Sequence, residues 1–102
     1  MRVELLYIEG CPNVAPTMDR LRHTLEHCGI QSPIIQVLVD DADHARTVQF
    51  LGSPTVRING FDIEPSARSR TDYGLACRTY EDGTGVPSDA LMRAGIEAAY
   101  GY

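Results

Sequence analysis

Two apolar segments, separated by one amphipathic pattern, limit the folds that are open to this chain. Residues 3–8 and 34–39 are almost wholly apolar, which is typical of central, parallel strands covered on both faces. Between them, apolar side chains recur at spacings of four and three residues and form one stripe along a helix: Val14, Met18, Leu21, Leu25 and Cys28. Gly29 then favours the end of that helix. The three segments predict a right-handed βαβ unit.

The segment after residue 39 predicts a short helix and a hairpin. Aspartates within positions 40–43 favour a helix start, and Gly52 offers a stop. Two strand-like segments, 55–58 and 61–64, then flank Asn59-Gly60, which tolerates positive φ at both central positions of a tight turn. We expect two antiparallel strands there.

The last third of the chain predicts a loop and one more helix. Residues 65–86 are rich in Ser, Arg, Thr, Gly and Asp and predict a long loop or lid. Ser88 suits the N-cap of a helix that runs to about Ala99. The whole chain therefore predicts a single α/β domain over residues 1–102. Its expected order is β-α-β-α-β-β-α, with a four-stranded mixed sheet and helices on both faces.

The charge balance and the cysteine count exclude several classes of function. A net charge of −5 gives no basic surface for a phosphate backbone, so we expect no nucleic-acid partner. The apolar run near the N-terminus is too short for a signal-peptide core or a membrane span, so we expect a cytoplasmic protein without a membrane partner. Three cysteines do not make a secreted disulfide framework and indicate free thiols. The oligomeric state stays open.

Cys11 lies where the first strand ends and the helix begins. Unpaired backbone N–H groups and the positive end of the helix dipole gather there, and both stabilise a thiolate over a thiol. We therefore expect Cys11 to be a nucleophile. Val14 occupies the place where a local dithiol would have its second cysteine, so a local two-cysteine cycle is not expected. Either Cys11 caps the helix and Pro12 begins it, or Asn13 caps it and Pro16 falls in the first turn.

Two short motifs, taken in order, carry a resemblance to a known superfamily. Gly10-Cys11-Pro12-Asn13 and Gly52-Ser53-Pro54-Thr55-Val56 resemble the thioredoxin and glutaredoxin superfamily, and the runs 5–13 and 70–78 are similar to small bacterial thioredoxin-like (seleno)proteins. The resemblance implies a thioredoxin-like fold and a cis peptide bond before Pro54. It also implies that Ser53, Pro54 and Thr55 form a substrate platform beside Cys11, with Pro12 and Asn13 next to the substrate.

Cys77 is the candidate for a second, resolving thiol. In the expected topology the fourth strand returns to the edge of the sheet at which Cys11 lies, so the segment that follows begins near it. Arg78, with Arg68 and Arg70, would favour a thiolate or an anionic thiol substrate there. The alternative is a structural cysteine among solvated arginines.

These residues predict a thiol–disulfide oxidoreductase that uses no cofactor. Cys11 would attack a protein or low-molecular-weight substrate, and Cys77 or an external thiol would resolve the mixed disulfide. The alternatives are a protein that binds mercury, arsenite or copper through thiolates, and a non-catalytic thioredoxin-like interaction module. Cys28, about 25 Å along the helix from Cys11, is expected to pack in the core. We expect no metal site at the H-x-x-E-H match in residues 23–27, because both imidazoles point toward water.

Overall fold

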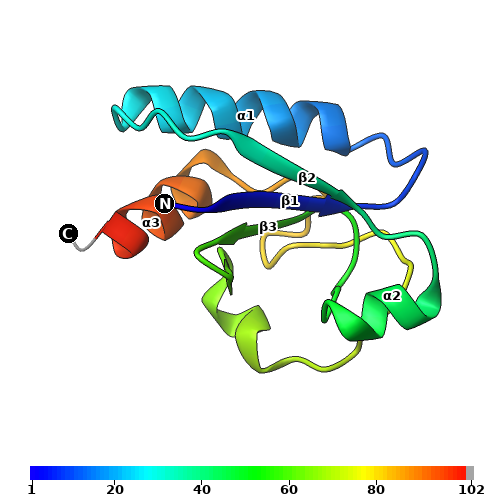
Figure 1. The fold of residues 1–102 in the computed structure, drawn as a ribbon. Helices are drawn as coiled ribbons and strands as arrows, with labels where there is room; N and C mark the ends of the chain where they lie inside the picture. Colours follow the sequence, from blue (N-terminus) through cyan, green and yellow to red (C-terminus); the bar gives the residue numbers. More distant parts are fainter. Residues whose placement is uncertain (101–102) are drawn as a thin grey trace.

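A four-stranded mixed sheet forms the centre of the molecule. The computed structural model describes residues 1–100, so the last two residues of the expected 1–102 domain lie outside the described part. The strands are β1 (Val3–Tyr7), β2 (Ile34–Leu38), β3 (Thr55–Ile58) and β4 (Phe61–Asp62). Their order is β2-β1-β3-β4, with β1 parallel to β2 and β3 antiparallel to both β1 and β4 (Figure 1). The expected α/β class and the mixed sheet are confirmed.

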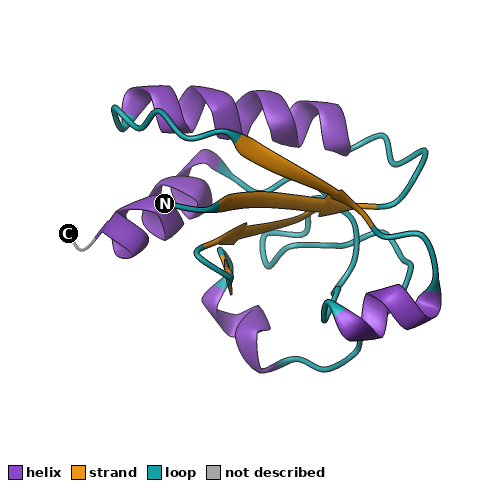
Figure 2. Ribbon diagram, in the orientation of Figure 1, coloured by secondary structure: helices purple, strands orange, loops and turns teal. Residues whose placement is uncertain are grey.

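Helices cover both faces of this sheet (Figure 2). They are α1 (Val14–His27), α2 (Ala42–Thr47), the 3-10 helix η1 (Pro65–Ser69) and α3 (Asp89–Tyr100). The larger core cluster joins α1 and α3 to one face of the sheet through Val3, Leu21, Leu25, Val56, Ile58, Ile63, Met92 and Ile96. The smaller cluster joins α2 to the other face through Leu6, Val39, Ala45 and Phe50. Adjacent residues of a strand face opposite sides, which is why β1 can serve both clusters.

The second strand differs from the expectation. We expected both apolar strands to be central, and β1 is, but β2 lies at the edge of the sheet. Ile35 and Leu38 of β2 are 45% and 43% exposed. An apolar run has the same appearance in sequence at the edge and in the middle of a sheet, so this prediction was wrong for β2.

The predicted turns and helix ends are largely confirmed. Asn59 and Gly60 have φ angles of 53° and 84° between β3 and β4, as the hairpin prediction requires. Ser88 Oγ accepts a hydrogen bond from Leu91 N–H at 3.1 Å at the start of α3. However, α2 ends at Thr47, so Gly52 is not its stop.

The segment after the hairpin differs in part from the expected long loop or lid. The fourth strand has only two residues rather than the expected four, and the chain turns directly into η1. Ala67 in η1 is buried, and so are Arg78 and Tyr80 further on. Three buried side chains therefore anchor the expected loop at 65–86 to the domain, while most of its other residues are exposed.

Candidate functional site

Cys11 lies in the loop between β1 and α1. Its backbone N–H donates to Ile8 O at 3.4 Å, and Val14 N–H at the start of α1 donates to Cys11 O at 3.4 Å. Cys11 is partly buried, and Pro12 beside it is exposed. The sulfur-bearing residue is thus held at the strand-to-helix junction, as the sequence predicts.

The helix start is the second of the two that the sequence left open. Asn13 is the N-cap of α1, so Pro16 falls in the first turn, where its missing N–H costs little. The Asn13 side chain lies directly against Gly85, where an added Cβ would collide with it. Asn13 therefore joins the β1–α1 loop to the segment before α3, and does not cap the helix with its side chain.

Cys77 pairs with Ser53 at this end of the sheet. An isolated parallel bridge joins them: Ser53 N–H donates to Ala76 O at 2.8 Å, and Arg78 N–H donates to Ser53 O at 3.0 Å. Paired residues of a sheet direct their side chains to the same face. The Ser53 hydroxyl accepts a hydrogen bond from Ile8 N–H at 3.2 Å, so the β1–α1 loop also contacts Ser53. Figure 1 shows this loop (blue) and the segment around residue 77 (yellow) at the same end of the sheet.

The expected substrate platform is covered by the chain itself. The Ser53–Pro54 peptide bond is cis, as the resemblance implied. Ser53 and Thr55 are 0% exposed and Pro54 is buried. Pro54 O accepts a hydrogen bond from the Tyr80 hydroxyl at 2.6 Å, and both backbone groups of Ser53 are bonded to the bridge. The chain's own residues therefore occupy the backbone groups of Ser53 and Pro54 with which the expected platform would pair an extended substrate.

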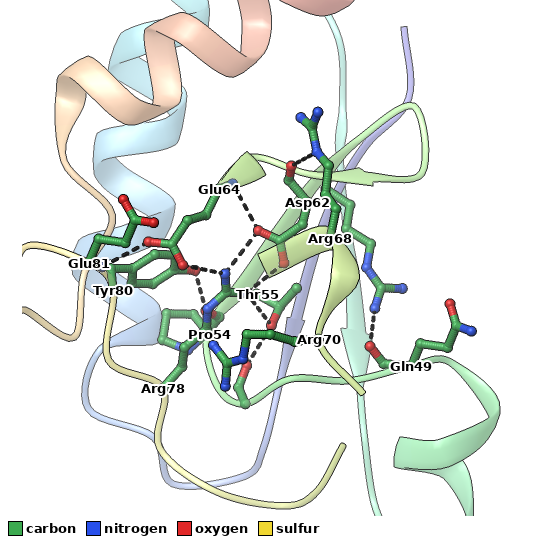
Figure 3. Close-up of polar contacts among 12 residues, drawn as sticks. Gln49, Pro54, Thr55, Asp62, Glu64, Arg68, Arg70, Arg78, Tyr80 and Glu81 are labelled. Atoms are coloured by element: carbon green, nitrogen blue, oxygen red, sulfur yellow. Dashed lines mark hydrogen bonds and ion pairs between the residues drawn. The ribbon is translucent and has the colours of Figure 1, made fainter. Parts of the chain in front are cut away.

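Arg78 is buried among ion-pair partners and does not lie at the surface as expected. Its side chain is 1% exposed and forms a two-pronged pair with Asp62, at 2.7 and 2.9 Å (Figure 3). It also donates to Glu64 Oε1 at 3.2 Å and to Thr55 Oγ1 at 3.1 Å. Its guanidinium carbon lies 4.3 Å from the centre of the Tyr80 ring. Because this cation faces two buried carboxylates, it is not available to attract an anionic substrate.

Burial shifts the proton equilibria of this cluster. Burial alone would lower the pKa of Arg78, but the hydrogen bonds and charge of Asp62, with Tyr80 and Glu64, hold that pKa above its ordinary value. Burial also raises the pKa of Tyr80, against the opposing charge of Arg78. Arg78 is therefore charged and Tyr80 is neutral at ordinary pH.

The partners of Arg78 were missed by sequence reasoning. Polar and apolar residues alternate at positions 61–64, and the usual expectation is that the acids face water. The structure departs from it at both acids and at Phe61, because Phe61 is 62% exposed while Asp62 and Glu64 are 7% and 3% exposed; Ile63 is buried in the core. The one available signal was that two acids spaced two residues apart share a face and require a buried cation if that face is inward. Arg68 and Arg70 are exposed, and their partners in the structure are not the carboxylates that pair with Arg78. Arg68 Nε donates to the backbone oxygen of Asp62, and Arg70 pairs with Asp72.

The other candidate residues lie away from this cluster. Cys28 is the C-cap of α1 and packs against the larger core cluster, as expected. His23 and His27 are exposed. Within residues 1–100, no group of three or more His, Cys, Asp or Glu side chains is arranged to hold a metal ion.

No helix in the described part of the chain has the length and apolar character needed to cross a membrane. No protein-family model, curated protein or solved structure matches this chain.

Proposed function

We propose that this chain is a thioredoxin-like thiol–disulfide oxidoreductase in which Cys11 is the nucleophile and Cys77 is the resolving thiol. The order of the elements supports the fold, because it follows β-α-β-α-β-β-α with one added 3-10 helix. The proposal includes a cytoplasmic location, since a reducing compartment keeps thiols free.

One observation carries the proposal: a series of three contacts links Cys77 to Cys11 through Ser53 and Ile8. Cys77 forms the bridge to Ser53, Ser53 Oγ binds Ile8 N–H, and Ile8 O binds Cys11 N–H. Each of these contacts is a single hydrogen bond or backbone pair. A disulfide forms only between cysteines whose Cα atoms lie within about 7 Å, so we take Cys77, which is linked to the loop of Cys11, as the candidate partner rather than Cys28 at the far end of α1.

The chemistry of the proposed cycle is thiol–disulfide exchange. The Cys11 thiolate attacks one sulfur of a substrate disulfide, a mixed disulfide forms, and the first substrate thiolate leaves and takes up a proton. The Cys77 thiolate then attacks the Cys11 sulfur and releases the second substrate thiol. Two electrons pass to the substrate, and a Cys11–Cys77 disulfide remains that an external thiol reduces.

The test is mass-spectrometric mapping of disulfides after the reduced protein reacts with oxidised glutathione. We expect a Cys11–Cys77 bond in the unaltered chain and a Cys11–glutathione adduct that accumulates in Cys77→Ser. Cys11→Ser should lose reductase turnover. Cys28→Ser is the matched control, because that thiol packs at the far end of α1, and it should behave like the unaltered chain.

Other outcomes contradict the proposal in distinguishable ways. Undiminished turnover in Cys11→Ser would exclude Cys11 as the nucleophile. Stoichiometric capture of arsenite or mercury without any disulfide exchange, lost in Cys77→Ser, would favour a soft-metal binding protein. Inert behaviour of Cys11 toward both probes would favour a non-catalytic interaction module.

A further inference from the structure

We infer that this site accepts low-molecular-weight disulfides and excludes extended polypeptides, because the chain's own residues 74–80 cover the Ser53–Pro54 backbone at the end of the sheet where the Cys11 loop lies (Figure 1). The inference rests on the proposed function and names its class of substrate. We refer to residues 74–80 as the covering segment.

The covering segment is bonded to the backbone that precedes β3. Gly74 N–H donates to Phe50 O at 3.1 Å, and the bridge at Cys77 uses both the N–H and the C=O of Ser53. The Tyr80 hydroxyl binds Pro54 O at 2.6 Å. An extended polypeptide that adds to a sheet needs free main-chain donors and acceptors of this kind. Here they are already used.

The covering segment is also packed too closely to move aside readily. A Cβ placed on Gly52 would lie 3.0 Å from Arg78 Cβ and 3.2 Å from Ala76 O, so the two backbones are in close contact. Arg78 and Tyr80 are each 3% exposed, and Arg78 is tied to two buried carboxylates. Displacement by a polypeptide would separate these buried charges, which is costly.

The sulfur-bearing residues stay within reach of a small molecule. Cys11 is partly buried and Cys77 is exposed, and the neighbouring Pro12 is exposed as well. A small disulfide needs only access to the Cys11 sulfur and no pairing with the backbone. The exchange step is the one given above: a Cys11–substrate disulfide forms, one small thiol leaves, and Cys77 releases the other.

The test compares two disulfides of different size on the reduced protein. Bis(2-hydroxyethyl) disulfide is the small probe, and insulin is the polypeptide probe. Because admitting an extended polypeptide would separate Arg78 from its buried carboxylates, we expect the second-order rate constant for insulin to be lower than that for the small disulfide by about 100-fold or more. Equal rate constants for the two probes would overturn the inference and leave the proposed function intact. Failure of Cys11 to react with either probe would overturn both.

A variant of Tyr80 provides the second measurement. Tyr80→Phe removes the bond to Pro54 O and should loosen the covering segment, so the rate on insulin should rise relative to the rate on the small disulfide. Tyr73→Phe is the matched control: the same hydroxyl is removed from a half-buried ring outside the bridge, and the ratio should not change. An unchanged ratio in a folded Tyr80→Phe protein, or the same rise in the control, would contradict the role of the covering segment. If Tyr80→Phe does not fold, the comparison of probes on the unaltered chain decides.

Discussion

Replacing Arg78 by methionine is expected to destabilise the chain by about 3 kcal/mol. Breaking a buried ion pair by removing one partner typically costs about 3–5 kcal/mol, because a charge is left buried without its counterion. Arg78 pairs with two carboxylates whose side chains are 7% and 4% exposed, so neither can be solvated in its place. Each carboxylate keeps one backbone donor, since Asp62 accepts from Glu64 N–H and Glu64 accepts from Glu81 N–H. We therefore place the loss at the lower end of that range.

The assay is urea unfolding followed by far-ultraviolet circular dichroism, with the slope of the transition fitted separately for each variant. A loss of about 3 kcal/mol is a large share of the roughly 5–15 kcal/mol by which domains of this kind are stable. Arg70→Met is the matched control, because Arg70 pairs with Asp72 at the surface, where the side chains are 39% and 66% exposed. Surface pairs contribute about 0–1 kcal/mol. The reasoning is refuted if Arg78→Met unfolds at the same urea concentration as the control.

Three further changes test other parts of the structure. Tyr80→Phe leaves a buried carbonyl unpaired and should lower the free energy of unfolding by about 1–3 kcal/mol. Burial raises the pKa of Tyr80, so the stability that its hydroxyl contributes is complete below the ordinary tyrosine pKa of about 10 and is lost as the pH rises beyond it. The free energy of unfolding should therefore decline less steeply above about pH 10 in the variant. Ser88→Ala should cost about 1 kcal/mol in the same unfolding assay, because the N-cap bond of α3 is lost. Gly95→Ala should lower the melting temperature despite the better helix propensity of alanine, because the new Cβ would lie 2.9 Å from Ile63 Cγ2. Gly74→Ala is the control and should leave the melting temperature almost unchanged, because its Cβ would meet nothing within 4 Å.

Local patterns in the sequence predicted most of the secondary structure for stated physical reasons. The apolar stripe from Val14 fixes the face of α1, and Asn59-Gly60 supplies the two positive φ angles of the hairpin. Asp41 caps α2 by accepting a hydrogen bond from His44 N–H, as an acidic helix start suggests. Each of these features depends on residues close together in the chain.

What sequence reasoning missed depends on contacts between distant residues. The edge position of β2 depends on which strands pair, and the apolar residues of β2 do not indicate that position in the sequence. The buried place of Arg78 depends on Asp62 and Glu64, which lie 16 and 14 residues away, and neither acid looks like a core residue in sequence. The rule that charged residues lie at the surface fails where buried charges of opposite sign pair with one another.

The buried arginine and the exposed thiol are two results of one alternation. In an extended segment, adjacent side chains point to opposite sides and residues two apart share a side. Arg78 and Tyr80 are both buried, and Cys77 and Thr79 are both exposed. The ion pair that draws Arg78 inward therefore fixes Cys77 outward, next to Ser53 and at the end of the sheet where Cys11 lies. We expected Cys77 at this end of the sheet because a full fourth strand would run back to it. However, β4 has only two residues, and the Ser53–Cys77 bridge and the buried Arg78 hold the segment there instead.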